Sequence, residues 1–463
     1  MSARIFLLFL FFAACGLPAA WGAQSAANIT SIHGTGQFRP EAKADWSAAK
    51  VEQDLLAGQY VRTGEFSRMG LLFRDRTQLR LNEKTVLQVK DVGAQTRLRL
   101  DVGRAWTQSR TLPDRLYMET PSATAAIRGT DWDLEVDETG RAVLTVLSGE
   151  VEFFNEHGRL VVQQNEAAEA RVGRAPTKLI FVRPRDRVQW VTAYAVEPLR
   201  RISLSGRAFG ELEAALAGAA PAAKGRILAD LGRWQEAEAL FRAPVANGFS
   251  DPLGAGYAAL RHGKPEEAQT LFDRVGAVQA GEAELLALGR VSLSLVTDDF
   301  ARAFAALTAL TREARPTQPA AYLLLADLML YAGNNEQALA YLNQGLERFP
   351  GDARLHSALS GAYLFADERG KSREAVAAAR QRDARAPEAA LAAGDLARIE
   401  GDGKAATQAY RSAIALKPAD DRGWYGLGRV NTEKEEVREG RSHLAKALER
   451  HARGPGYQGA LGT

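Results

Sequence analysis

A repeat of about 34 residues runs through the second half of the chain and limits the folds that this half can adopt. From residue 207 onward the sequence is rich in Ala, Leu and Glu at helical spacing, and a small residue recurs in each unit. These small residues are Ala237, Ala268, Ala303, Ala338, Ala375, Ala406 and Gly440. They follow one another at intervals of 31, 35, 35, 37, 31 and 34 residues, which leaves room for two helices per unit. The pattern predicts an all-α solenoid of stacked helix pairs over residues 207–452.

The first half of the chain has a different period. Between residues 28 and 162, short alternating or β-branched runs are separated by Gly, Asn or Asp at a spacing of about ten residues. This spacing predicts an all-β domain over residues 24–182, an antiparallel sandwich or roll. Residues 183–206 are expected to be a linker with one helix through 188–195. Residues 453–463, with four glycines and a proline, are expected to be a flexible tail.

The first 23 residues have the features of a signal peptide. Arg4 supplies a positive charge, and residues 5–14 form an apolar core of about ten residues, which is too short to span a bilayer. Ala20 and Gly22 are suited to cleavage before Ala23. The mature protein is therefore predicted in the periplasm or associated with the outer membrane. Cys15 leaves a lipoprotein as the less favoured alternative, because Phe12 stands where such a signal has a Leu-like residue.

Composition excludes several classes of partner and chemistry. The 59 Lys and Arg residues nearly balance the 56 Asp and Glu residues, for a net charge of +3, so no nucleic-acid partner is expected. The single cysteine lies in the predicted signal peptide, so the mature chain has no disulfide, thiolate cluster or cysteine nucleophile. After that segment, no stretch is expected to span a membrane.

We find no residue pattern that predicts an enzyme. The six histidines form no metal-ligand pair, and no nucleophile elbow or phosphate-binding loop is present. Asp131 and Asp133 lie on one face of a predicted strand, where acid–base chemistry is one interpretation and a solvated strand edge the simpler one. We therefore expect no catalytic site, no metal and no cofactor.

Helical motifs in the second half are specific enough to compare with a known family. Trp424, Leu427 and Gly428 have the W-x2-L-G spacing of a tetratricopeptide (TPR) repeat. Two further units carry small residues on both helices and a proline at the end: Gly394, Ala397, Ala406, Tyr410, Ala413 and Pro418, and Ala326, Gly333, Ala338, Leu342, Gly345 and Pro350. The second half thus resembles TPR repeats. The repeat-signature positions that this resemblance implies, with a structural role, are Ala268, Ala338, Ala375, Ala406, Trp424 and Gly428.

Strand motifs in the first half resemble another family. The segments are GQYVRTG (58–64), LLFRDRTQLRL (71–81), LDVGRAW (100–106), TPSATAAIRGT (120–130) and LSGEV (147–151). Over residues 29–172 they are similar to the FecR-type periplasmic domain. Ile127, Arg128, Gly129 and Thr130 look like that family's V-R-G-T. Arg128, Gly129 and Thr130 have two interpretations, a structural turn clamp, which we favour, and ligand capture.

The resemblances together predict the function. FecR-type regulators generally carry a cytoplasmic anti-sigma segment and a membrane helix before this domain, whereas this chain begins with a signal peptide, so direct control of a sigma factor is not expected. We predict an exported, non-catalytic scaffold or sensor-like protein that binds protein partners in the cell envelope, an outer-membrane receptor or assembly among them. The alternative is a cell-wall module that binds peptidoglycan or polysaccharide.

Two further expectations concern particular surfaces. Arg183, Arg185, Arg187, Arg200 and Arg201 form a cluster that is interpreted as a solvated helix surface, with anionic lipid or glycan binding as the alternative. The last predicted helix pair, residues 424–448, is expected to expose apolar surface, because no polar closing helix follows it.

Overall fold

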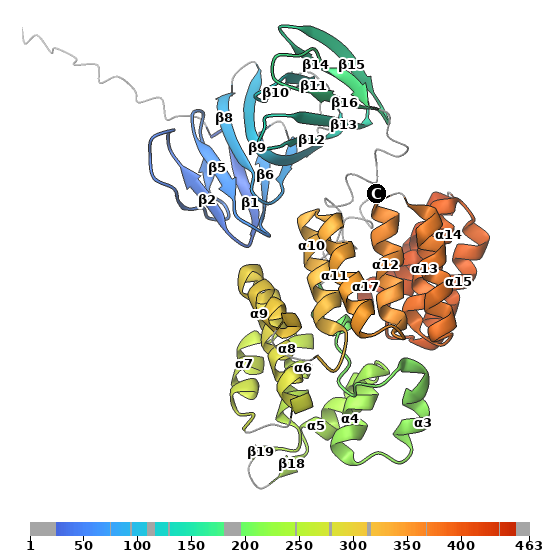
Figure 1. Ribbon diagram of the computed structural model, residues 1–463. Coiled ribbons are helices and arrows are strands. Elements are labelled where there is room, and N and C mark those ends of the chain that lie inside the picture. The colour runs from blue at the N-terminus through green and yellow to red at the C-terminus, as the bar shows by residue number, and fades with distance from the viewer. Residues whose placement is uncertain are drawn as a thin grey trace, which may run out of the picture.

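The computed structural model describes residues 25–74, 76–92, 95–108, 116–127, 130–179, 196–245, 248–276, 280–312, 316–366, 368–434 and 436–450. Strands fill the described chain up to residue 179, and helices dominate from residue 212 onward (Figure 1). The predicted signal peptide, the expected helix at 188–195 and the tail at 453–463 lie outside the described residues. So do Cys15, Arg128, Gly129 and the three arginines at 183, 185 and 187.

The first half consists of strands, with no helix among its described residues. The strands are β1 (Ala27–His33), β2 (Gly36–Arg39), β3 (Ser47–Ala48), β4 (Asp54–Leu55), β5 (Tyr60–Thr63), β6 (Arg68–Phe73), β7 (Gln78–Leu81), β8 (Val86–Val92), β9 (Thr96–Gln108), β10 (Leu116–Glu119), β11 (Thr124–Ile127), β12 (Asp131–Val136), β13 (Ala142–Ser148), β14 (Glu150–Asn155), β15 (Gly158–Gln163), β16 (Ala167–Ala170) and β17 (Thr177–Leu179). The first sheet has the order β4-β1-β6-β7-β9-β12-β13-β16-β17. The second has the order β3-β2-β5-β8-β9-β10-β11-β14-β15. The predicted all-β fold is confirmed.

Strand β9 belongs to both sheets and bends at Gly103. Before the bend it pairs with β8 and, in parallel, with β10, and after the bend it pairs with β7 and β12. Gly103 has a φ of +100°, and an added Cβ would lie 2.4 Å from the Cα of Thr85. No other residue fits there without displacing the backbone of Thr85, which directly precedes β8. This parallel pair is the one departure from the antiparallel arrangement among the described pairings.

The expectation of a solvated edge at Asp131 and Asp133 is wrong for Asp133. Strand β12 lies inside the first sheet, between β9 and β13. The Asp133 side chain is fully buried, and its two carboxylate oxygens accept hydrogen bonds from Nε of Arg104 at 2.9 and 3.0 Å. Burial alone would lower the pKa of Arg104, but the negative charges of Asp133 and Glu135 raise it. The pair is thus a structural ion pair inside the domain.

The second half is a stack of antiparallel helix pairs. Its helices are α3 (Leu212–Leu216), α4 (Pro221–Asp230), α5 (Trp234–Phe241), α6 (Pro252–Arg261), α7 (Pro265–Asp273), α8 (Ala280–Val296), α9 (Phe300–Arg312), α10 (Ala320–Ala332), α11 (Asn335–Arg348), α12 (Ala353–Phe365), α13 (Arg369–Arg382), α14 (Pro387–Glu400), α15 (Gly403–Leu416), α16 (Asp421–Glu433) and α17 (Val437–Arg450). Short elements are η1 (Pro198–Arg200), η2 (Phe209–Glu211), β18 (Pro244–Val245) and β19 (Gly248–Phe249). Each small residue that marked the sequence repeat lies buried on the second helix of a pair, from Ala237 on α5 to Gly440 on α17. These positions let the paired helices approach closely.

The solenoid curves until its first and last repeats meet. A Cβ added at Gly232, in the turn after α4, would lie 3.0 Å from Cβ of Ala419, just before α16. A second contact joins residues before the first pair to the later repeats, because the backbone N–H of Gly210 donates a hydrogen bond to Asp383, between α13 and α14, at 3.2 Å. The first helices of the pairs therefore face a shared interior.

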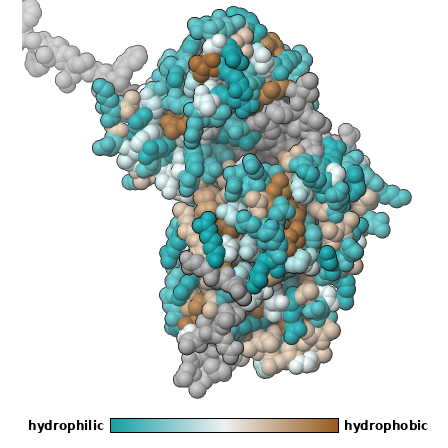
Figure 2. All heavy atoms as spheres, in the orientation of Figure 1, coloured by the Kyte–Doolittle hydropathy of each residue, from teal (hydrophilic) through white to brown (hydrophobic). Residues whose placement is uncertain are grey.

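The last helix pair does not expose the apolar surface that we expected. Leu444 and Ala447 of α17 are buried against α16, and Val437 is the single exposed large hydrophobic residue among the described residues of this pair. The outward positions hold polar residues such as Arg438 and Arg441. Helix α17 thus has the polar outer side of a closing helix. The face of the molecule seen in Figure 2 is likewise mostly hydrophilic, with small, separate hydrophobic patches.

Candidate protein-interaction site

A cavity of about 2010 Å³ lies between the first sheet and the interior of the solenoid. The first helix of every pair from α4 to α16 contributes to its lining. One lining residue from each of these helices is Asp230, Arg261, Val296, Tyr331, Arg354, Glu388 and Tyr425. The facing wall is formed by β1, β6 and β7, with Arg68, Leu72 and Arg80. The cavity is therefore the concave face of the solenoid, where solenoid proteins bind their ligands.

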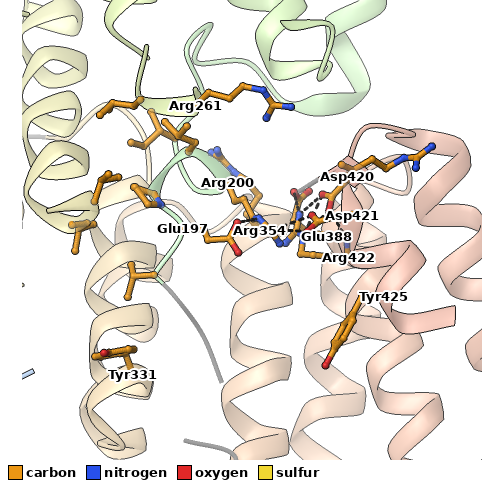
Figure 3. A pocket seen from close by; sticks show the side chains of 18 of the residues that line it. Glu197, Arg200, Arg261, Tyr331, Arg354, Glu388, Asp420, Asp421, Arg422 and Tyr425 are labelled. Atoms are coloured by element: carbon orange, nitrogen blue, oxygen red, sulfur yellow. Dashed lines mark hydrogen bonds and ion pairs between the residues drawn. The ribbon is translucent and has the colours of Figure 1, made fainter. Parts of the chain in front are cut away.

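Residues 196–206, here called the strap, run through this concave face. The strap contains the single turn η1 and is otherwise irregular. Ile202 and Leu204 are buried in the apolar core of the solenoid, with Val196 and Leu199 packed against its edge. Figure 3 shows Glu197 and Arg200 of the strap in the middle of the cavity, among charged side chains of the last repeats. The chain thus places its own segment against the surface that a partner peptide would contact.

Two adjacent arginines anchor the strap to helices that are far apart in the sequence. Arg201 forms a two-pronged contact with Asp327 of α10, with Nε and Nη2 donating to the carboxylate at 2.7 and 2.6 Å. Arg200 reaches α16, where Nη2 donates to Asp421 at 3.0 Å. Burial alone would lower the pKa of Arg200, but Glu197 and Asp421 outweigh it and raise the pKa above its ordinary value. Forked contacts of this type are specific for arginine.

Polar side chains of the solenoid also bind the backbone of the strap. Gln318 accepts from the N–H of Ser203 at 3.0 Å and donates to the carbonyl of Ser203 at 3.2 Å. Asp230 of α4 accepts from the N–H groups of Leu204 and Ser205, both at 2.9 Å, and from both serine hydroxyls. These contacts recognise an irregular backbone that has no secondary-structure partner of its own.

A second charged cluster surrounds the Arg200 anchor. Arg422 of α16 donates to Asp420 and to Glu388 of α14. Burial alone would raise the pKa of Asp420, but the Arg422 guanidinium outweighs it and holds this pKa well below its usual range. Because Arg422 binds both Asp420 and Glu388, these ion pairs hold the wall of the cavity formed by α14 and α16 in place.

The β domain contacts the solenoid at the C-terminal end of α10. Arg68 donates to the carbonyl of Tyr331 and lies over its ring, with 3.8 Å from Cζ to the ring centre. Asn82 donates to the carbonyl of Ala332 at 3.3 Å. Arg68 is the first residue of β6, and Asn82 directly follows β7. Both donate to carbonyls that the end of a helix leaves without a partner. The positive charge of Arg68 also complements the helix dipole.

Thr130 is the described member of the predicted V-R-G-T site. Thr130 is buried, and its hydroxyl has no hydrogen-bond partner among the described residues. Thr130 does not line the cavity described above.

The repeat-signature residues lie on helices of the solenoid, from α7 to α16. Ala268, Ala338, Ala375 and Ala406 are buried in the helix pairs, and an added Cβ at Gly428 would lie 2.7 Å from Leu444. Trp424 is half-buried, with Lys446 and Arg450 over its ring at 4.9 Å each. Its neighbour Tyr425, rather than Trp424, lines the cavity.

Sequence reasoning missed the anchoring role of Arg200 and Arg201. Their interpretation as part of a solvated helix surface is wrong, because both guanidinium groups are bound to acids of the solenoid. A signal was present in the alternation of Ile202 and Leu204 with serines, which begins four residues after Pro198. That pattern is atypical of a helix and typical of a segment bound along one side.

A separate cation–aromatic stack lies on the second sheet. Arg39 and Arg62 have Cζ atoms 4.5 and 4.4 Å from the ring centre of Trp46, and Arg39 also lies over Tyr60 at 4.4 Å. Nε of Arg62 donates to Gln37 at 2.7 Å, whereas Nε of Arg39 is buried and has no hydrogen-bond partner among the described residues. Neither arginine forms an ion pair within the part of the chain that the structure describes.

Each half contains a segment that matches a known family model. Residues 59–152 match the family model described as FecR protein, and residues 297–362 match a tetratricopeptide repeat model. These matches confirm the predicted FecR-type domain followed by TPR repeats. No curated protein matches the sequence.

Solved structures are similar to separate parts of the chain. A putative anti-sigma factor from Parabacteroides distasonis is 14% identical, with a TM-score of 0.27, and covers 29% of this chain and 65% of its own. The APC/C hetero-tetramer Cut9–Hcn1 gives 13% identity, a TM-score of 0.40, and coverage of 52% and 47%. A thermophilic TPR protein of Thermus thermophilus gives 19% identity, a TM-score of 0.31, and coverage of 46% and 96%. This chain thus spans less than two thirds of the anti-sigma factor and of the Cut9–Hcn1 chain.

No described helix is both long and apolar enough to cross a membrane. In the same part of the chain, no group of three or more His, Cys, Asp or Glu side chains is arranged to hold a metal ion.

Proposed function

We propose that this chain is an exported, non-catalytic scaffold or sensor-like protein of the cell envelope that binds other proteins. The observation that carries the proposal is the concave face of the solenoid, where Asp230, Gln318, Asp327 and Asp421 hold an irregular segment by both its side chains and its backbone. A surface with this chemistry is suited to recognising a protein segment. The FecR-type domain supports a role in envelope signalling or assembly, with an outer-membrane receptor among the expected partners.

Export is the part of the proposal that rests on sequence. The charged start, short apolar core and small residues before Ala23 support removal of the signal peptide and residence in the periplasm or at the outer membrane, with lipidation at Cys15 as the minor alternative. Cell fractionation with mass analysis of the amino terminus tests this. We expect a periplasmic product that begins near residue 23, and an intact Met1 on a cytoplasmic product contradicts it.

Protein binding is tested by photo-crosslinking in cells that express the full chain. A photoreactive residue replaces Tyr425, which lines the cavity, or Arg441, which is exposed on the outer side of α17. Mass spectrometry of the adducts should show an envelope protein joined at position 425 and absent at 441. If no adduct forms at position 425, at position 441 or at further positions on the solenoid and the β domain, a protein-binding role is contradicted.

One observation favours the cell-wall alternative. Arg39 and Arg62 form no ion pair with a described residue, so their charges are available to a carboxylate-bearing glycan such as peptidoglycan. Pelleting with purified sacculi tests this alternative. Binding by the wild-type chain that is lost in the Arg39→Ala, Arg62→Ala variant would support it, and wild-type protein that stays in the supernatant would exclude it.

A further inference from the structure

We propose that the concave face of the solenoid is a receptor for non-helical segments that carry two adjacent arginines followed by alternating apolar residues, and that the strap is its internal occupant. A partner segment of the same chemistry would bind by replacing the strap. This inference rests on the proposed protein-binding function and names the partner class and the control of that same surface.

Charge complementarity defines the first part of the recognition. Asp327 and Asp421 come from the fourth and the last helix pairs, and each binds one of the two adjacent arginines of the strap. Their side chains are 17% and 6% exposed with the strap in place. If the strap left, both carboxylates would lose these charge-assisted hydrogen bonds, and a segment with two adjacent arginines would restore them. The site is therefore selective for a cationic replacement.

Backbone and apolar contacts define the second part. Gln318 pairs with both backbone groups of Ser203, and Asp230 accepts from the next two N–H groups, so the surface reads an exposed backbone rather than a helix. Ile202 and Leu204, two residues apart, enter the same apolar core. The segment from Arg201 to Leu204 has the order basic, apolar, small, apolar. The solenoid matches this order with Asp327 for the arginine, its apolar core for Ile202 and Leu204, and Gln318 and Asp230 for the backbone.

Covalent attachment makes the strap a strong competitor for this surface. A tethered segment has an effective concentration on the order of millimolar. A free segment of the same sequence should therefore bind the wild-type chain weakly and bind a chain with a released strap more tightly. This gives the protein a closed and an open state of one surface.

The probe is a labelled peptide with the sequence of residues 196–207, VEPLRRISLSGR, and its binding to the full mature chain is followed by fluorescence anisotropy. The variant Arg200→Glu, Arg201→Glu places acids against Asp421 and Asp327 and should release the strap. We expect it to bind the peptide at least tenfold more tightly than the wild type does. Adding Asp327→Asn to this variant should weaken binding at least tenfold. Arg438→Glu, Arg441→Glu is the matched control, because both arginines are exposed on the outer side of α17, and it should leave the wild-type affinity unchanged.

A second measurement keeps the proposal testable if the strap variant does not fold. Excess peptide is added to the wild-type chain, and hydrogen exchange of residues 203–206 is followed by mass spectrometry. Exchange should increase with this peptide and stay constant with a peptide in which both arginines are replaced by alanine. No increase with either peptide, or equal affinity of a folded strap variant and the wild type, would overturn the proposal. Crosslinks to the solenoid in cells would then leave the protein-binding function intact, so the two failures are distinguishable.

Discussion

The β domain and the solenoid distribute their contacts in opposite ways. In the β domain, β1 pairs with β6, and β9 joins both sheets, so residues far apart in the chain depend on one another. In the solenoid, each helix contacts mainly its partner and the adjacent pairs, as α14 does with α15 and with α12 and α13. The strap is the exception, because it connects α4, α10 and α16 through the interior. A local change should therefore spread through the β domain but remain within one or two repeats of the solenoid.

The largest effect is expected from Gly103→Ala, at the bend of β9. The added Cβ would lie 2.4 Å from a backbone atom of Thr85, in addition to the strain of a positive φ. We expect a loss of about 3 kcal/mol or more of the free energy of unfolding, measured by loss of the β-type circular dichroism signal on heating. Gly58→Ala is the control, because Gly58 also has a positive φ but an added Cβ meets no atom within 4 Å. Equal costs at the two positions would show that β9 does not bend against Thr85.

A smaller and more local effect is expected from Gly256→Ala in α6. The added Cβ would lie 2.4 Å from Cε1 of Phe272 on α7, and overpacking of this kind costs about 1–3 kcal/mol. Gly361→Ala in α12 is the matched control, since nothing lies within 4 Å of its added Cβ, and it should stabilise the helix by about 0.5–1 kcal/mol. Hydrogen exchange should show the loss of protection confined to the repeats around α6. Loss of protection along the whole solenoid would contradict local packing.

The two halves should also differ in their response to acid. Asp420 has a lowered pKa in the folded protein, because Arg422 outweighs the effect of burial, so its contribution to stability is present above the unfolded pKa of about 3.9. That contribution is lost as the pH falls further toward the folded pKa. In the β domain, Glu166 also has a lowered pKa, beside Lys178, but it lies near the surface, where solvent screens the pair.

We therefore expect the helical signal to lose thermal stability more steeply than the β-type signal between about pH 5 and pH 2. Asp420→Asn keeps a residue that caps a helix but removes the charge, so the helical signal of this variant should depend less on pH. A variant as acid-sensitive as the wild type would show that Asp420 does not carry the effect.

The sequence predicted what is local and missed what is distant. Helix pairs followed from the spacing of residues such as Ala268 and Ala338, because each packs within its own pair. The two-sheet role of β9 did not follow, because the pairing of Gly103 with Val136 leaves no periodic trace in the sequence. The outer side of α17 was misjudged for a related reason, since its polar residues are recognisable as a closing face only once α16 is in place.

The candidate site was harder to predict for the same physical reason. Arg200 and Arg201 are 221 and 126 residues away from the acids that bind them, so neither residue type nor spacing identifies those partners. Recognising the strap required the curvature of the solenoid, which brings α4, α10 and α16 around one interior.

The most direct test of the account is a double-mutant cycle between Arg201 and Asp327. If the strap occupies the concave face, the two residues form a forked ion pair at 2.6 and 2.7 Å, and each alanine variant should destabilise the solenoid. The double variant should then cost less than the sum of the two, with a coupling energy of about 1 kcal/mol or more in the full chain. A coupling energy of zero, with both variants folded, would show that the strap does not lie in the solenoid interior and would contradict the account.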